Sequence, residues 1–181
     1  MEQLTVQLKN AAYPVYIGSG LLAQVGALLR SASSVSRWAV VADENAAKLT
    51  ALRDKLIAGL SEIPHSILNG DAVHRLPGNV NFCFEGIEGE SLLLLLDDKG
   101  ICASSGSACT SGSLDPSHVL LAIGRVHDIA HGSLRLTLSE EITAEDVAYT
   151  IQAVKEVVAY LRGMSPIWRE LVSGQREFII Q

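Results

Sequence analysis

Residues 132–138 read Gly-Ser-Leu-Arg-Leu-Thr-Leu, and the fold prediction starts from this alternation. Successive side chains of an extended chain point to opposite faces, so the three leucines share one face while Arg135 and Thr137 share the other. This pattern is typical of a strand that is buried on one side only. The sequence therefore predicts a sheet with one apolar and one polar face.

Further elements are predicted on both sides of this strand. Two strands, Ser66–Leu68 and Asn79–Phe84, precede it, with a polar turn between them. A helix with Thr50 as its N-cap comes before these strands, because Leu52, Leu56, Ile57 and Leu60 recur at helical spacing.

The chain after residue 114 contains two helix start signals. Asp115 is predicted to cap a short helix that ends at Gly124, with Pro116 at its first position. Thr143 and Asp146 resemble a capping box in which Asp replaces the usual Glu or Gln, and a long helix is expected to follow to about Arg162.

Two apolar stretches are less clearly defined. Glu90–Leu96 has the composition of a buried helix, but a strand is the alternative and periodicity does not decide between them. Ile101–Ala103 is predicted to be a short strand. The first 49 residues predict the order β-β-α-β, with strands near Leu4–Leu8, Val15–Ile17 and Trp38–Ala42, which is the start of an α/β unit.

Composition limits the classes of function. The chain has 181 residues, a formal charge of −6 and no basic cluster, so binding to nucleic acid is not expected. No apolar run has the ~20 residues that a membrane span needs. The amino terminus lacks the pattern of a secretory signal, and the number of cysteines, three, is odd. We therefore expect a cytoplasmic location.

The segment Ser104–Ser113 consists almost entirely of small or hydroxylated residues and contains Cys109. Such a segment buries little surface, so a loop with a solvent-reachable thiol is expected. Cys83 and Cys102 lie in predicted apolar strands and are expected to be buried. The residues alone leave Cys109 equally open to two interpretations, a surface cysteine of no function and a nucleophile. The spacing of the three cysteines along the chain matches no known pattern of zinc ligands.

An ordered series of motifs resembles the carboxy-terminal region of NifS/IscS-type cysteine desulfurases, from about Thr50 to Trp168. The motifs are Leu76-Pro77-Gly78-Asn79-Val80-Asn81, Glu88-Gly89-Glu90-Ser91, Ala103-Ser104-Ser105-Gly106-Ser107-Ala108-Cys109-Thr110-Ser111-Gly112-Ser113, Pro116-Ser117-His118-Val119-Leu120, Ala130-His131-Gly132-Ser133-Leu134-Arg135 and Met164-Ser165-Pro166-Ile167-Trp168. The resemblance implies the small domain of a fold-type I, pyridoxal-phosphate-dependent transferase, an α/β (α+β) fold with helices on a largely antiparallel sheet.

By this resemblance, Cys109 corresponds to the cysteine that takes sulfur from substrate cysteine, leaving alanine and an enzyme-bound persulfide. Arg135 corresponds to the residue that binds the substrate carboxylate. None of Lys9, Lys48, Lys55, Lys99 and Lys155 lies in the Ser-His-Lys context of the cofactor lysine. We therefore expect no pyridoxal phosphate on this chain and no activity of the chain alone. The alternatives are a non-enzymatic sulfur acceptor and a fusion protein without catalytic activity.

The amino-terminal residues resemble the opening of 3-dehydroquinate synthase, on the motifs Val6-Gln7-Leu8, Tyr13-Pro14-Val15-Tyr16-Ile17-Gly18-Ser19-Gly20-Leu21-Leu22 and Ala39-Val40-Val41-Ala42-Asp43-Glu44-Asn45. The predicted organisation is a synthase-like segment at 1–49, a desulfurase-like domain at 50–170 and a tail at 171–181. Apolar residues in Leu92–Leu96 and Phe178–Ile180 predict a homodimer. A sulfur acceptor or scaffold protein is a further expected partner.

Overall fold

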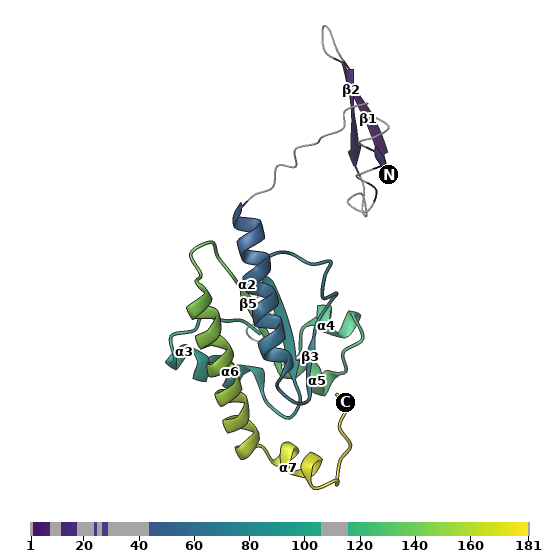
Figure 1. Ribbon diagram of the computed structural model, residues 1–181. Helices are drawn as coiled ribbons and strands as arrows, with labels where there is room; N and C mark the ends of the chain where they lie inside the picture. Colours follow the sequence, from purple (N-terminus) through teal and green to yellow (C-terminus); the bar gives the residue numbers. More distant parts are fainter. Residues whose placement is uncertain are drawn as a thin grey trace. The chain divides into compact units, whose positions relative to one another are not determined.

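The computed structural model describes residues 2–7, 12–17, 24, 27–28, 44–105 and 116–180 (Figure 1). The chain divides into two compact units, Met1–Val41 and Ala42–Gln181. The candidate site lies in the second unit.

The first unit contains an antiparallel pair of strands. Strand β1 (Glu2–Gln7) pairs with β2 (Ala12–Ile17), with Glu2 opposite Ile17. Strand β2 begins at Ala12, three residues before the predicted start at Val15, and contains Pro14; a proline is tolerated where a strand has an unpaired edge. Gln24, Ala27 and Leu28 are helical, and the predicted strand Trp38–Ala42 lies outside the described residues.

The second unit is built on a three-stranded antiparallel sheet of order β3-β4-β5. Its strands are β3 (Ser66–Leu68), β4 (Asn79–Phe84) and β5 (Ser133–Thr137). All three strands were predicted from the sequence, and the alternation of β5 places Leu134 and Leu136 in the core, where they are 1% and 5% exposed.

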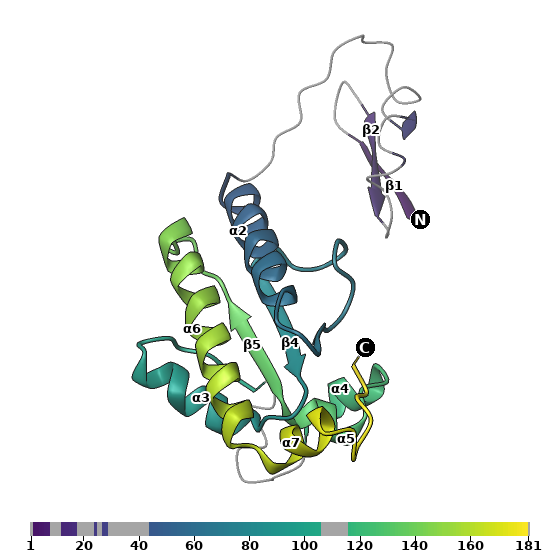
Figure 2. The ribbon, with the colours of Figure 1, turned by 60° about the horizontal axis from the view of Figure 1, so that its bottom comes forward.

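Three helices cover one face of this sheet. Helix α2 (Glu44–Ser61) and helix α6 (Ala144–Met164) lie side by side across it, and α3 (Gly89–Asp98) packs against α6 (Figure 2). The main core between helices and sheet contains Leu56, Leu60, Val80, Phe82, Phe84, Leu92, Leu96, Leu134, Val154 and Val158. Burial of each such side chain contributes roughly 1.5–3 kcal/mol, so this face holds the unit together.

The helix boundaries correct one prediction and decide between two alternatives for another segment. Helix α2 begins at Glu44, and Thr50 lies inside it, where its hydroxyl donates to the carbonyl of Ala46 instead of capping the helix. The stretch Glu90–Leu96 is helical, because Leu92 and Leu96 reach the core four residues apart. The predicted capping box of α6 is confirmed: the Thr143 side chain accepts from the backbone N–H of Asp146.

The segment Ile101–Ala103 is not a strand, contrary to prediction. Only Ser104 forms a bridge, to Arg135 on the edge of β5. Helix α4 (His118–Ala122) begins after Ser117, so Pro116 precedes the helix and the predicted cap, Asp115, lies outside the described residues. Helices α5 (His127–His131) and α7 (Pro166–Val172) were not predicted; each is too short to show a periodic pattern.

The other face of the sheet is covered at one end. A small cluster of Cys83, Leu120, Ile129, Ala130 and Ile180 joins α4, α5 and the segment near residue 180 to this face. Ile180 is buried in this cluster and Leu92 and Leu96 are buried in the main core, which removes all three from the apolar surface on which the predicted homodimer was argued. Among the described helices, none has the length and apolar character to cross a bilayer.

Candidate active site

A row of polar residues crosses the face of the sheet opposite the helices. Asn69 follows β3 and donates its N–H to the carbonyl of Asn81 in β4 at 2.8 Å. Asn81 is the register partner of Arg135 in β5, and Arg135 pairs in turn with Ser104. Because Val80, Phe82, Leu134 and Leu136 face the helices, Asn81 and Arg135 face away from them.

Arg135 lies half-buried in the middle of this row. Its Nη2 donates to Ser104 Oγ at 3.4 Å, and no described residue accepts from its Nε or Nη1. Side chains of register partners have Cβ atoms about 4.5–5.5 Å apart, so the guanidinium is flanked by Asn81 on one side and Ser104 on the other. A guanidinium with free donors on an open face can hold a carboxylate through two parallel hydrogen bonds.

The chain at Ser104 and Ser105, which precedes Cys109 in the sequence, is fixed beside β5. The backbone N–H of Ser104 donates to the carbonyl of Arg135 at 3.1 Å, and Ser133 Oγ donates to the carbonyl of Ser105 at 2.7 Å. Cys109 itself lies outside the described residues. Cys109 is four positions further along the chain than Ser105, and a fully extended chain of that length spans at most about 14 Å.

Asn69 connects the polar row to the turn between α4 and α5. Asn69 is buried, at 5% exposed, and its Nδ2 donates to Asn81 Oδ1 at 2.6 Å. Its Oδ1 accepts from Nε of Arg125 at 2.7 Å, and the Nη2 of Arg125 donates to the carbonyl of Leu68 at 3.2 Å. The buried amide is therefore satisfied on both sides.

Asn69, Asn81 and Arg125 were not predicted from the sequence as site residues. Asn81 could have been found, since it alternates with the apolar residues of its strand and so shares the polar face. Asn69 and Arg125 carried no such signal, because they lie in turns 56 residues apart and meet only in the folded chain.

The two other cysteines differ in environment. Cys83 is fully buried, as predicted, and burial raises the pKa of its thiol while a hydrogen bond from Asn69 Nδ2 acts in the opposite direction. Cys102 is exposed, contrary to prediction, because the segment around it makes no strand pairing. A buried thiol with a raised pKa is a poor nucleophile, so Cys83 is a core residue.

Comparison with known proteins gives this arrangement a family. Residues 6–149 match the aminotransferase class-V family. The chain belongs to this family. Cysteine desulfurase IscS of Clostridium botulinum is 52% identical over 133 residues, which cover 72% of this chain and 34% of that protein. Cysteine desulfurase IscS of Methylococcus capsulatus is 40% identical over 175 residues, covering 95% of this chain and 42% of that protein.

A solved NifS-like protein superposes with a TM-score of 0.56 at 30% identity, covering 65% of this chain and 29% of that chain. The fold is thus the predicted α/β fold with helices on a small antiparallel sheet, and it is shared with a NifS-like protein. The chain spans about a third of the length of the curated IscS proteins it matches. The family match begins at residue 6, inside the range 1–49 for which a synthase-like segment was predicted.

Class-V aminotransferases of the desulfurase type depend on pyridoxal phosphate, which needs a lysine amine. The described lysines do not fit that role. Lys48 donates to the carbonyl of Glu140, Lys99 pairs with Glu156, Lys155 pairs with Glu62, and Lys55 is exposed on α2. All four belong to the helical side of the sheet, whereas Arg135 lies on the other face. The described residues therefore provide no aldimine lysine beside Arg135.

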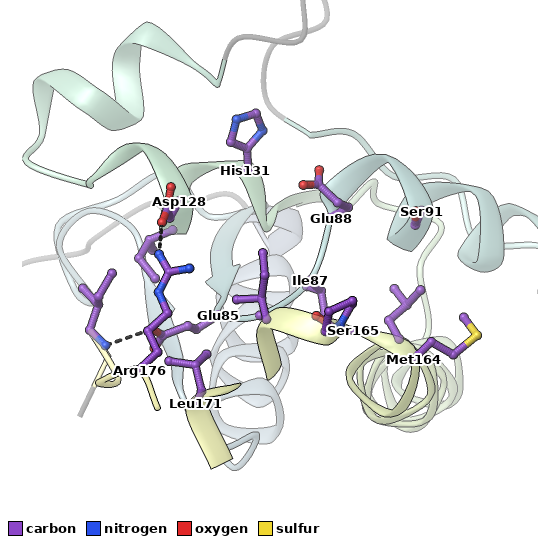
Figure 3. Close-up of a pocket in the computed structure, with 16 residues that line it drawn as sticks. Glu85, Ile87, Glu88, Ser91, Asp128, His131, Met164, Ser165, Leu171 and Arg176 are labelled. Atoms are coloured by element: carbon purple, nitrogen blue, oxygen red, sulfur yellow. Dashed lines mark hydrogen bonds and ion pairs between the residues drawn. The ribbon is translucent and has the colours of Figure 1, made fainter. Parts of the chain in front are cut away.

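This class-V chain also contains a groove away from Arg135. It has a volume of about 450 Å³ and is walled by the turn after β4, by α5 and by the end of α6 with α7. Figure 3 shows the Arg176 side chain reaching Asp128, with which it forms an ion pair. The buried carboxylate of Glu85 accepts from the N–H groups of Ile179 and Ile180, at 2.9 Å each. These charges are satisfied within the chain.

Proposed function

We propose that this chain carries the sulfur-accepting part of a cysteine desulfurase, with Cys109 as the residue that receives sulfur and Arg135 as the residue that binds the carboxylate of the sulfur-donating amino acid. The observation that carries the proposal is Arg135, which lies on the face of the sheet away from the helices and whose Nε and Nη1 have no acceptor among the described residues. The segment leading to Cys109 starts beside it at Ser104 and Ser105.

The chain does not remove sulfur from free cysteine by itself. Its described lysines lie on the helical side of the sheet. The amine that anchors pyridoxal phosphate therefore has to come from outside these residues, for example from a second polypeptide. The cofactor supplies the electron sink for carbon–sulfur cleavage when it is bound. We assign this chain no step of that chemistry.

The second candidate is a non-enzymatic sulfur acceptor, favoured by the same placement of the lysines. Here the thiolate of Cys109 attacks the outer sulfur of a persulfide on another protein. The sulfur–sulfur bond of the donor breaks, the donor leaves as a thiolate, and Cys109 becomes the persulfide. The exchange is balanced and needs no oxidant.

Both candidates are tested by locating added sulfur. We expect mass spectrometry to find one extra sulfur on Cys109 after incubation of the chain with an active desulfurase and L-cysteine. The Cys109→Ala variant should lose this sulfur, and Cys102→Ala, which removes the exposed thiol of Cys102, should keep it. An unmodified Cys109 contradicts both candidates and favours a fusion protein without activity.

A second measurement tests the lack of independent activity, which both candidates share. The chain is mixed with L-cysteine and pyridoxal phosphate alone, and the absorbance of a lysine aldimine and the release of sulfide are followed. We expect neither. A lysine aldimine, or sulfide release that Cys109→Ala abolishes, would contradict the proposed lack of independent activity.

Three further proposals concern the whole chain. Residues 1–49 are proposed to be a structural, synthase-like segment that binds no nucleotide, followed by the desulfurase-like domain at 50–170 and a tail at 171–181. We propose a cytoplasmic homodimer that meets a sulfur acceptor or scaffold protein. No nucleic acid or membrane partner is proposed, given the net charge of −6.

A further inference from the structure

We infer that Asn81 is a second carboxylate-binding residue beside Arg135, and that Arg125 and Asn69 are positioning residues that fix the direction of its amide. This inference rests on the proposed function, because it concerns the same amino-acid carboxylate. It adds a chain of hydrogen bonds that determines which end of Asn81 faces the ligand.

The direction of each amide follows from the chemistry of Arg125. A guanidinium can only donate hydrogen bonds, so the atom of Asn69 that lies 2.7 Å from Arg125 Nε has to be its oxygen. The Nδ2 of Asn69 then faces Asn81, where it lies 2.6 Å from Oδ1. Only one orientation of each amide fits these two hydrogen bonds, because reversing either amide would bring two donors or two acceptors together.

Asn81 is thereby left with its NH₂ group pointing away from Asn69. No described residue accepts a hydrogen bond from Asn81 Nδ2. Its register partner is Arg135, whose Nε and Nη1 also have no acceptor among the described residues. The face thus presents an amide donor and a guanidinium from adjacent strands, which together suit the two oxygens of a carboxylate.

The chain of hydrogen bonds from Arg125 through Asn69 to Asn81, called the relay below, keeps the Asn81 amide from rotating. Asn69 is 5% exposed, and Arg125 is anchored a second time by its bond to the carbonyl of Leu68. Turning Asn81 would leave the buried Nδ2 of Asn69 with Cys83 Sγ, at 3.1 Å, as its remaining acceptor. Because a sulfur is a weaker acceptor than an amide oxygen, the observed direction is favoured.

The test uses the full chain and L-alanine as the probe, with L-alaninamide as the control that lacks a carboxylate. In ¹H–¹⁵N spectra we expect the Asn81 side-chain NH₂ signals to shift on titration with L-alanine and not with L-alaninamide. Loss of one hydrogen bond to a charged group weakens affinity by roughly tenfold, so Asn81→Ala should raise the dissociation constant for L-alanine by about that factor.

Asn79→Ala is the matched control, because Asn79 lies two residues away on the same strand and is the partner of Thr137 instead of Arg135. We expect it to change the affinity less than twofold. Asn69→Asp tests the relay: its carboxylate still pairs with Arg125 but can only accept, so Asn81 has to turn its oxygen toward the ligand. Weakening comparable to Asn81→Ala, with native signal dispersion, is expected.

Two results overturn the inference. One is an Asn81 amide that does not shift with L-alanine in the unmodified chain; the other is an Asn69→Asp variant that is folded and binds L-alanine normally. If Asn81→Ala does not fold, the affinity of Asn69→Asp for L-alanine decides whether the inference holds. Failure of the proposed function is separate: L-alanine affinity that survives Arg135→Ala, or the absence of sulfur on Cys109, contradicts that proposal whatever Asn81 does.

Discussion

Arg162 shows how one buried side chain can join several segments. It is 6% exposed, and its guanidinium donates to the carbonyls of Glu85, Pro64 and His65 at 3.0, 2.8 and 3.1 Å. It also lies over the ring of Trp168, at 3.9 Å from the centroid. Burial lowers the pKa of Arg162 to about 10, and the Glu85 carboxylate acts in the opposite direction, so the side chain is charged at neutral pH.

Replacing this residue should be costly. Arg162→Ala removes a donor from three backbone carbonyls, of which only that of His65 keeps another among the described residues, the N–H of Glu85. We expect the free energy of unfolding to fall by about 3 kcal/mol in urea titrations. Arg169→Ala, which removes an exposed arginine in α7, should change it by less than about 0.5 kcal/mol. Equal effects of the two variants would contradict the anchoring role of Arg162.

At the scale of elements, Gly132 sets how closely β5 approaches the turn after β4. A Cβ at this position would meet the carbonyl oxygen of Phe84 at 2.1 Å and that of Ile87 at 3.2 Å. These are backbone atoms, so they cannot move aside as a flexible side chain does. The Gly132 carbonyl also accepts from the N–H of Phe84 at 2.9 Å.

We therefore expect Gly132→Ala to destabilise the unit by about 3 kcal/mol, measured by thermal or urea unfolding. Gly163→Ala in α6 is the matched control, because nothing lies within 4 Å of a Cβ there. That substitution should stabilise the protein by about 0.5 kcal/mol through better helix propensity. A neutral Gly132→Ala would show that the strand tolerates displacement.

The amino-terminal cap of α6 predicts a pH dependence. The Asp146 carboxylate accepts from the hydroxyl and the N–H of Thr143, at 2.6 and 2.9 Å, and these bonds lower the pKa of Asp146 below its ordinary value of 3.8. A lowered carboxyl pKa stabilises the folded state above the unfolded pKa, and this contribution is lost as the pH falls through the folded value.

Thr143→Ala should cost about 1 kcal/mol at neutral pH. The difference from the unmodified protein should shrink in acid, below pH 3.8, where Asp146 becomes protonated. Urea titrations across this range measure both effects. Thr150→Ala, which removes a hydroxyl bonded to the Asp146 carbonyl within the helix, should show no such pH dependence; a constant cost for Thr143→Ala would contradict the linkage.

At the scale of the whole molecule, apolar side chains remain exposed after the core has formed. Met164, Ile167 and Ile179 line the groove near α7 and are 53%, 46% and 49% exposed. These residues, instead of the buried Leu92 and Leu96, now provide the physical argument for the proposed homodimer.

Light scattering after size-exclusion chromatography should give twice the chain mass of 19.3 kDa. Ile167→Asp should shift the distribution toward a monomer, because a charge in an apolar contact is costly to desolvate. Leu94→Asp, at an exposed position on α3, is the control and should leave the mass unchanged. A monomer at high concentration in the unmodified protein would contradict the homodimer.

The sequence by itself determined the three strands, the long amphipathic helices and the polar side of β5, because alternation and helical spacing are local patterns. A series of motifs in the sequence also predicted Arg135 as a site residue. Tertiary structure alone decided the helical state of Glu90–Leu96 and the single bridge at Ser104, since both depend on which partner packs nearby. The contact between Arg125 and Asn69 is of the same kind: a hydrogen bond between two distant turns leaves no periodic trace in the chain that forms it.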